Sequence, residues 1–204
     1  MVRRAQSADL GWLWFTQKTG DCVALDRRAY PSVIYDGHPK PWPEWVCRGP
    51  NGGGHINASW PAIDVHVEGA PKSRYDVSWT CDFGLFLVAK RWLTQIEDLI
   101  DGESTFVGSL VVSGDKLDSW ATIHGRLTPA LSSREGRHVS CPNCGNTATV
   151  IHGGTFFADP AAVGRPLIVN WNGIFVREDI VAERNVTTPI GAFKPSLVRY
   201  EPGC

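Results

Sequence analysis

The stretch GLFLVAKRWLTQI, residues 84–96, changes its hydrophobic period halfway along. Residues 83–89 form a continuous apolar run, which is typical of a central β-strand. In residues 91–100 the apolar side chains recur at helical spacing on one face, and Gly102 supplies a natural C-terminal stop. Residues 106–112 return to strand character. The region therefore predicts a strand–helix–strand unit.

The last third of the chain repeats this order. GIFVREDIVAERN, residues 173–185, predicts a strand and a short helix that ends at Asn185, and AFKPSLVRY predicts extended chain after it. A cysteine motif precedes each unit, CRGPNG at Cys47 and CPNCGN at Cys141. We infer an internal duplication in which the first motif has lost its second cysteine and carries Pro50 there; chance similarity is the alternative.

These patterns predict an α+β fold, mainly antiparallel sheet with short helices, in two pseudo-repeated halves with a zinc-knuckle-like turn. Residues 1–130 hold the degenerate cysteine motif and residues 131–204 the intact one, and we expect the halves to pack as one compact unit. The hydrophobic fraction of 43% and the charged fraction of 20% suit a globular protein.

The stretch HVSCPNCGN, residues 138–146, carries the strongest chemical signal, because Cys141 and Cys144 lie in a turn that suits one metal ion. A structural zinc needs four ligands, and the chain has no second Cys-x-x-Cys. We expect Cys47 and a histidine to complete a structural Zn²⁺ site. His55 is the favoured histidine; His138 and His152 are the other candidates. The alternative is a degenerate knuckle with free thiols.

The motifs together resemble a bacterial family named for its double CXXCG motif. The resemblance rests on VC at Cys47, WPAID at residues 60–64, LVAKRWL at 87–93, HGRL at 124–127 and CPNCG at 141–145. The first motif departs from the family pattern, since CRGPN replaces CXXCG. The resemblance implies an immunity protein that binds and neutralises a cognate bacterial toxin, without catalysis.

Two other functions are open. Zinc nucleobase deaminases use His-x-Glu and a later Pro-Cys-x-x-Cys, and HVE at residues 66–68 with CPNC imitates this pattern. Here the proline lies between the cysteines, and His66 lies in a strand pattern, so a solvent-facing strand edge is the favoured interpretation. A zinc-ribbon adaptor for nucleic acid is the second alternative, but a net charge of −1 with scattered basic pairs argues against nucleic acid as a partner.

The chain shows no export signal and no apolar run of membrane-spanning length, so we expect a cytoplasmic protein whose six cysteines are reduced and which has no membrane partner. Nine tryptophans exceed the needs of one modest core. We therefore expect several to be exposed for contact with the toxin. Trp42 and Trp45, in the proline-rich stretch, are the candidates.

Overall fold

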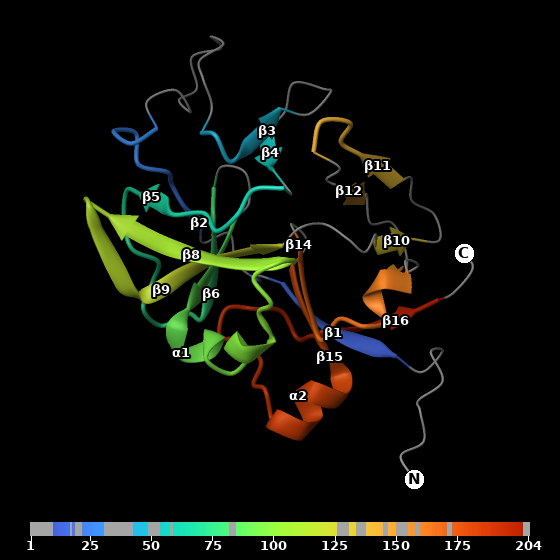
Figure 1. The fold of residues 1–204 in the computed structure, drawn as a ribbon. Helices are drawn as coiled ribbons and strands as arrows, with labels where there is room; N and C mark the ends of the chain where they lie inside the picture. Colours follow the sequence, from blue (N-terminus) through green and yellow to red (C-terminus); the bar gives the residue numbers. More distant parts are fainter. Residues whose placement is uncertain are drawn as a thin grey trace.

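The computed structural model describes most of the chain between residues 10 and 201. The described residues are 10–16, 18, 22–30, 43–48, 54–57, 59–81, 85–125, 131–133, 138–144, 147–149, 155–157, 160–170 and 173–201. Two six-stranded sheets and two short hairpins make up this part of the molecule (Figure 1).

The first sheet, sheet 1, has the strand order β2-β6-β7-β9-β8-β5. Its strands are β2 (Cys22–Val23), β5 (Val65–Val67), β6 (Val77–Thr80), β7 (Phe86–Ala89), β8 (Thr105–Val112) and β9 (Asp115–Gly125). The second sheet, sheet 2, has the order β10-β13-β16-β1-β15-β14. Its strands are β1 (Gly11–Phe15), β10 (Leu131–Ser133), β13 (Thr155–Phe157), β14 (Leu167–Asn170), β15 (Gly173–Arg177) and β16 (Ser196–Tyr200).

Five neighbouring strands have the same order and the same directions in both sheets. In sheet 1, β5 runs parallel to β8, and β8, β9, β7 and β6 follow with antiparallel neighbours. In sheet 2, β13 runs parallel to β16, and β16, β1, β15 and β14 follow with antiparallel neighbours. The strands β9 and β1 therefore occupy equivalent positions in the middle of the two sheets. β9 follows β8 directly along the chain, whereas β1 comes from the other end of the sequence.

The helices are few and short. They are α1 (Lys90–Leu93), the 3₁₀ turns η2 (Glu97–Leu99) and η3 (Pro160–Ala162), and α2 (Glu178–Arg184). The helix expected over residues 91–100 is split, because tighter i→i+3 hydrogen bonds begin at Gln95. Asn185 ends α2 in the left-handed conformation. The prediction of an α+β fold with mainly antiparallel sheet and short helices is confirmed.

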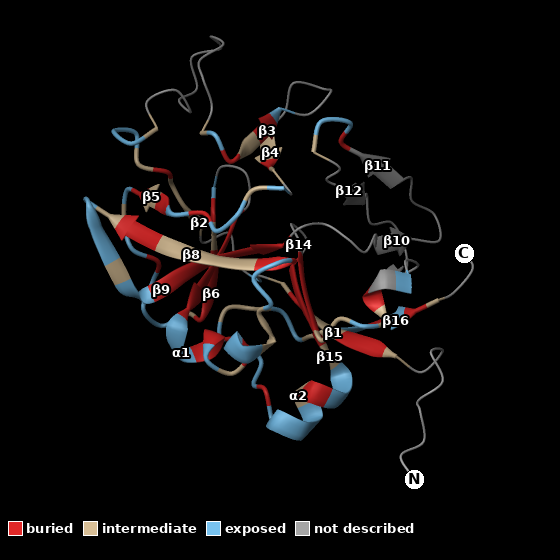
Figure 2. Cartoon of the chain, viewed as in Figure 1, coloured by how far each residue is buried: buried red, intermediate tan, exposed pale blue. Residues whose placement is uncertain are grey.

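The strands of both sheets are largely buried (Figure 2). Their buried side chains form three clusters, one between the sheets and one on the outer face of each sheet. Between the sheets, Phe86 and Val88 of sheet 1 belong to the same buried cluster as Ile174 and Val176 of sheet 2. The alternate residues of these strands face outward into two further clusters, with Leu87 in one and Phe175 in the other. Strands buried on both faces need apolar residues at every position, which explains the continuous hydrophobic runs of the sequence.

The two sheets approach each other closely where β9 ends. A Cβ at Gly125 would overlap the carbonyl oxygen of Val169 on β14, so only glycine fits at this position. β1 lies within the predicted first half, residues 1–130, yet it pairs with β15 and β16 of the second. The boundary at residue 130 stays a prediction.

Cys22 and Cys81 form a disulfide that joins β2 to the residue after β6. The expectation that the cysteines are reduced is therefore wrong for this pair, which no sequence motif marked. Cys47, Cys141 and Cys144 carry free thiols. No helix in the described part of the chain has the length and apolar character needed to cross a membrane.

Candidate metal centre

The first side of the candidate site is the hairpin of β3 (Val46–Arg48) and β4 (Gly54–Ile56). Cys47 and His55 are directly opposite each other in its antiparallel register. Opposed residues of a hairpin project from the same face, so the thiol and the imidazole point the same way. Cys47 is buried and His55 is half-buried.

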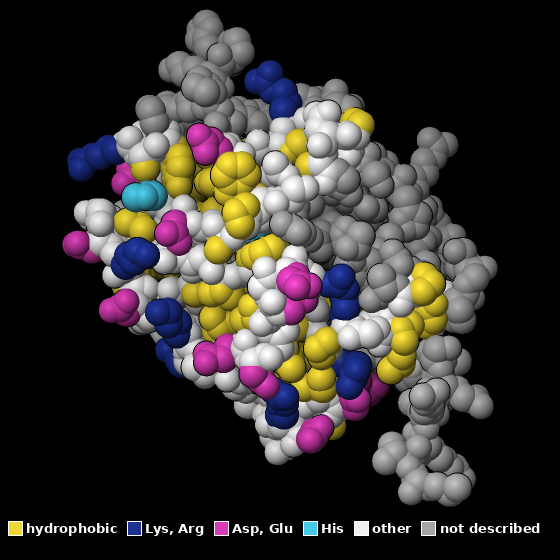
Figure 3. All heavy atoms as spheres, in the orientation of Figure 1, with side chains coloured by type: hydrophobic (Ala, Val, Ile, Leu, Met, Phe, Trp, Pro, Cys, Tyr) yellow, Lys and Arg dark blue, Asp and Glu magenta, His cyan; other side chains and the backbone are white. Residues whose placement is uncertain are grey.

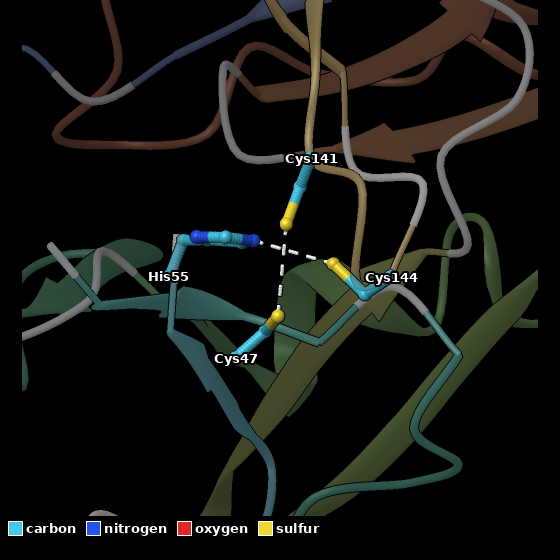
Figure 4. A group of neighbouring side chains, drawn as sticks. All are labelled: Cys47, His55, Cys141 and Cys144. Atoms are coloured by element: carbon cyan, nitrogen blue, oxygen red, sulfur yellow. Dashed lines mark hydrogen bonds between the residues drawn. The ribbon is translucent and has the colours of Figure 1, made fainter. Parts of the chain in front are cut away.

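The second side is the turn that follows β11 (His138–Ser140) and precedes β12 (Thr147–Thr149). Cys141 and Cys144 come from this turn, and the cysteine sulfurs point toward Cys47 and His55 (Figure 4). The side-chain amide of Asn143 donates a hydrogen bond of 2.9 Å to the carbonyl oxygen of Arg48. This bond fastens the turn to the β3–β4 hairpin, and both short hairpins lie side by side in Figure 1.

The four potential ligand atoms fit a tetrahedral ion. All four lie within 4.8 Å of one another. The Sγ atoms of Cys47 and Cys141 are 3.7 Å apart, and Nε2 of His55 is 3.2 Å from Sγ of Cys144. A zinc ion bonded to two sulfurs at about 2.3 Å would hold them about 3.8 Å apart, and a sulfur and a nitrogen about 3.5 Å apart. The sulfur pair already has that spacing.

Burial and neighbouring groups set the protonation of the site without a metal. Burial raises the pKa of Cys47 to about 12, with help from the adjacent Cys144 and Cys141 thiols. Burial also acts to raise the pKa of Cys141, but N–H groups of Asn143 and Cys144 donate to its sulfur and bring its pKa below the usual value. Burial lowers the pKa of His55, which favours the neutral, metal-binding imidazole.

The structure thus brings together the four residues that sequence reasoning selected as ligands, Cys47, His55, Cys141 and Cys144. The bound ion itself stays a prediction. Of the other two candidate histidines, His152 lies outside the described residues, as does the side chain of His138. The donor set of three sulfurs and one imidazole is one that structural zinc prefers.

The His-x-Glu part of the deaminase-like motif, residues 66–68, does not belong to this cluster. His66 is on β5, where its ring packs edge-on against Tyr30, and Glu68 forms an ion pair with Arg27. Cys47 and His55 complete the cluster of Cys141 and Cys144, so no His-x-Glu pair faces those cysteines among the described residues.

The expected aromatic contact surface differs from what is observed. Trp45 is only 6% exposed and packs edge-on against Tyr30, so it is a core residue, contrary to the expectation of exposure. Trp42 lies outside the described residues. The other described tryptophans are buried or half-buried and pack in the core clusters. Exposure was therefore the wrong expectation for the described indole rings, because large aromatics first fill cores; for Trp42 it stays a prediction.

The exposed large hydrophobic side chains are Ile190, Phe193 and Leu197 in the part of the chain that the structure describes. Sequence reasoning assigned residues 192–200 only as extended chain, although Pro189 and Gly191 on either side of Ile190 were an available signal for a loop. On the face drawn in Figure 3, acidic and basic side chains are interspersed, so neither sign dominates there.

Comparison of the sequence with protein-family models and with curated proteins finds no match.

Proposed function

We propose that this chain is a non-catalytic, zinc-stabilised protein of the immunity type, which binds and neutralises a cognate bacterial toxin. The observation that carries the proposal is the convergence of Cys47, His55, Cys141 and Cys144 from two separate hairpins. Four protein ligands fill a tetrahedral zinc and leave no position for a substrate or a reactive water. Such a site supports structure and offers no open coordination position for catalysis.

The location of the site favours a role in joining the halves of the chain. Cys47 and His55 precede β5 to β9 of sheet 1, and Cys141 and Cys144 precede β13 to β16 of sheet 2. An ion held by all four would join the two segments through coordination bonds. These bonds would add to the packing of the hydrophobic core that the two sheets share. The metal would then contribute directly to folding stability.

We also propose that the two halves are copies of one unit. The common order of five strands in the two sheets supports this, as does the position of one ligand-bearing hairpin before β5 to β8 and of the other before β13 to β16. In this scheme β1 is the first strand of the first copy and β9 is the first strand of the second copy. β1 pairs in sheet 2 with strands of the second copy, and β9 pairs in sheet 1 with strands of the first copy. This arrangement agrees with a family that carries two cysteine motifs in one chain.

Toxin neutralisation is proposed on the resemblance, supported by the closed metal centre and by the separation of His66 and Glu68 from it. The test is co-expression with the toxin encoded next to the gene for this chain. We expect the intact protein to restore growth and to co-purify with the toxin, carrying about one zinc per chain. Toxin toxicity that is unaltered by the folded, zinc-loaded protein would contradict the proposal.

A further inference from the structure

The loop of residues 189–193, here called the apolar loop, presents two large hydrophobic side chains to solvent. Ile190 is 58% exposed and Phe193 is 49% exposed. The loop connects α2 to β16 and passes beside sheet 1 on the way (Figure 1). Exposure of large apolar side chains to water is unfavourable in free energy. Two of them in one short loop make this loop a candidate contact site.

Backbone hydrogen bonds fix this loop to both sheets. Asp76 at the start of β6 donates its N–H to the carbonyl of Ile190 and accepts the N–H of Ile190 on its carboxylate. The N–H of Lys18 donates to Gly191, and the N–H of Phe193 donates to Thr16, beyond the end of β1. The loop backbone is therefore ordered before any partner binds, which lowers the entropic cost of association.

Gly191 is also seated closely. Its φ of +96° favours glycine, and a Cβ there would press on the ring of Tyr75. Two constraints, a left-handed backbone and a close aromatic neighbour, thus set the direction in which the loop turns. The exposed side chains on either side are held in place by this turn.

Three exposed basic residues flank the apolar loop or contact the residues that hold it. Lys194 follows Phe193, Lys18 bonds the loop through its backbone, and Arg74 lies 4.9 Å from the centre of the Tyr75 ring; all three are exposed. The one carboxylate among these partners, Asp76, is buried and neutralised by Arg91 at 2.5 Å. The described residues that flank the loop or bond to it therefore carry exposed positive charges and no exposed carboxylate.

We propose that the apolar loop is the anchor for a protein partner whose surface has an apolar pocket rimmed by acidic side chains. This proposal rests on the proposed function, which makes that partner the cognate toxin. Buried apolar anchors with a complementary charged rim are the arrangement that dominates protein–protein affinity. A loop with a fixed backbone and two apolar side chains fits such a pocket better than it fits a lipid surface, where amphipathic helices supply a broader apolar face.

The test is calorimetric titration of this protein with a purified, catalytically inactive variant of the toxin encoded beside its gene. The double variant Ile190→Ala, Phe193→Ala should raise Kd about 100-fold, since central anchors carry most of the binding energy. The double variant Arg74→Glu, Lys194→Glu should lower the association rate about tenfold at low salt, with a smaller difference at high salt.

Leu197→Ala is the matched control. Leu197 is 39% exposed, but its side chain lies against Gly11, at the end of β1 away from the apolar loop. The Kd of the Leu197→Ala variant for the toxin should stay within about twofold of the Kd of the unaltered protein. Zinc content and thermal unfolding of every variant should match those of the parent, which shows that the fold is intact.

The outcomes separate the two proposals. A parent protein that binds the toxin while the Ile190/Phe193 variant binds equally well overturns the assignment of this loop and leaves the proposed function intact. A folded parent protein that does not bind the toxin overturns both. Co-sedimentation with phosphatidylglycerol vesicles that disappears in the Ile190/Phe193 variant also overturns the assignment, because the loop is then a membrane contact.

Discussion

The β3–β4 hairpin and the β11–β12 hairpin each bring two candidate metal ligands to the same point, by different backbone routes. In the second, Cys141 and Cys144 come from one tight turn. In the first, Cys47 and His55 face each other across two strands. The opposed register of two hairpin strands thus places two candidate ligands as close together as the Cys-x-x-Cys turn does. A cysteine missing from the motif is compatible with a complete ligand set when a histidine occupies the opposing strand.

The two sheets show a second difference within a common plan. The central strand of sheet 1, β9, is joined to its neighbour β8 by a two-residue turn at Ser113 and Gly114, both with positive φ. The central strand of sheet 2, β1, has partners that lie more than 150 positions away along the chain. The same position in a sheet is therefore filled by local pairing in one case and by long-range pairing in the other.

The largest effect should follow from removing one ligand from either hairpin. Cys47→Ser and Cys141→Ser should each reduce bound zinc from about one per chain to nearly none, because a single ion takes ligands from both sides. Loss of a structural zinc should lower the melting temperature by roughly 10 °C or more. Elemental analysis and calorimetry measure both quantities.

Asn143→Ala is the control for these variants, since it removes the hydrogen bond to Arg48 and leaves all four ligands. It should retain zinc and cost about 1 kcal/mol in the free energy of unfolding. Full zinc occupancy in Cys47→Ser would contradict the joint site and show that the β11–β12 turn binds metal without the other hairpin.

The contact between the sheets gives an intermediate effect. Gly125→Ala should lower the free energy of unfolding by about 1–3 kcal/mol, because the new methyl group forces β9 away from the carbonyl of Val169. Gly164→Ala is the control, as it has no atom within 4 Å of its added Cβ. Denaturant titration compares the two, and equal stabilities would show that the sheets do not meet at Gly125 as described.

The smallest effect should come from making the hairpins more alike. His55→Cys replaces the imidazole by a fourth thiolate, and tetrahedral zinc accepts four cysteines as readily as three with a histidine. Zinc should stay near one per chain and the melting temperature should change by only about 2–4 °C, which corresponds to roughly 1 kcal/mol. The Co²⁺-substituted variant should show stronger thiolate-to-metal charge-transfer absorption; an unchanged spectrum would indicate that residue 55 is not a ligand.

Local patterns in the sequence predicted the elements that are decided locally. Residues 106–112 became β8, residues 173–176 lie in β15, and the helical face with Trp92 and Ile96 is buried as expected. The four ligand positions were also available, because Cys-x-x-Cys and a nearby Cys and His are chemically distinctive. Each element, and each of the two ligand pairs taken alone, depends on neighbours within about ten residues, whereas Cys47 and Cys141 are 94 positions apart.

The features that sequence reasoning missed depend on distant parts of the chain. The apolar run near the N-terminus gave no sign that β1 inserts between β15 and β16. The bond of Cys22 to Cys81 has no motif, since a disulfide depends on spatial approach. Trp45 occurs in a proline-rich stretch that suggested exposure, yet the indole fills space beside Tyr30 because burial of its large area outweighs the local irregularity of the backbone.

The central place of β1 has a consequence for how the protein is made. β1 leaves the ribosome more than 150 residues ahead of β15 and β16, its two hydrogen-bonded neighbours. At about 5–20 residues per second, β1 waits on the order of ten seconds with its edges unpaired. Sheet 1, whose β6 to β9 are contiguous along the chain, can assemble during that interval. Sheet 2 closes only after β15 and β16 have been made, so until then the nascent chain carries an unpaired apolar strand that chaperones have time to bind.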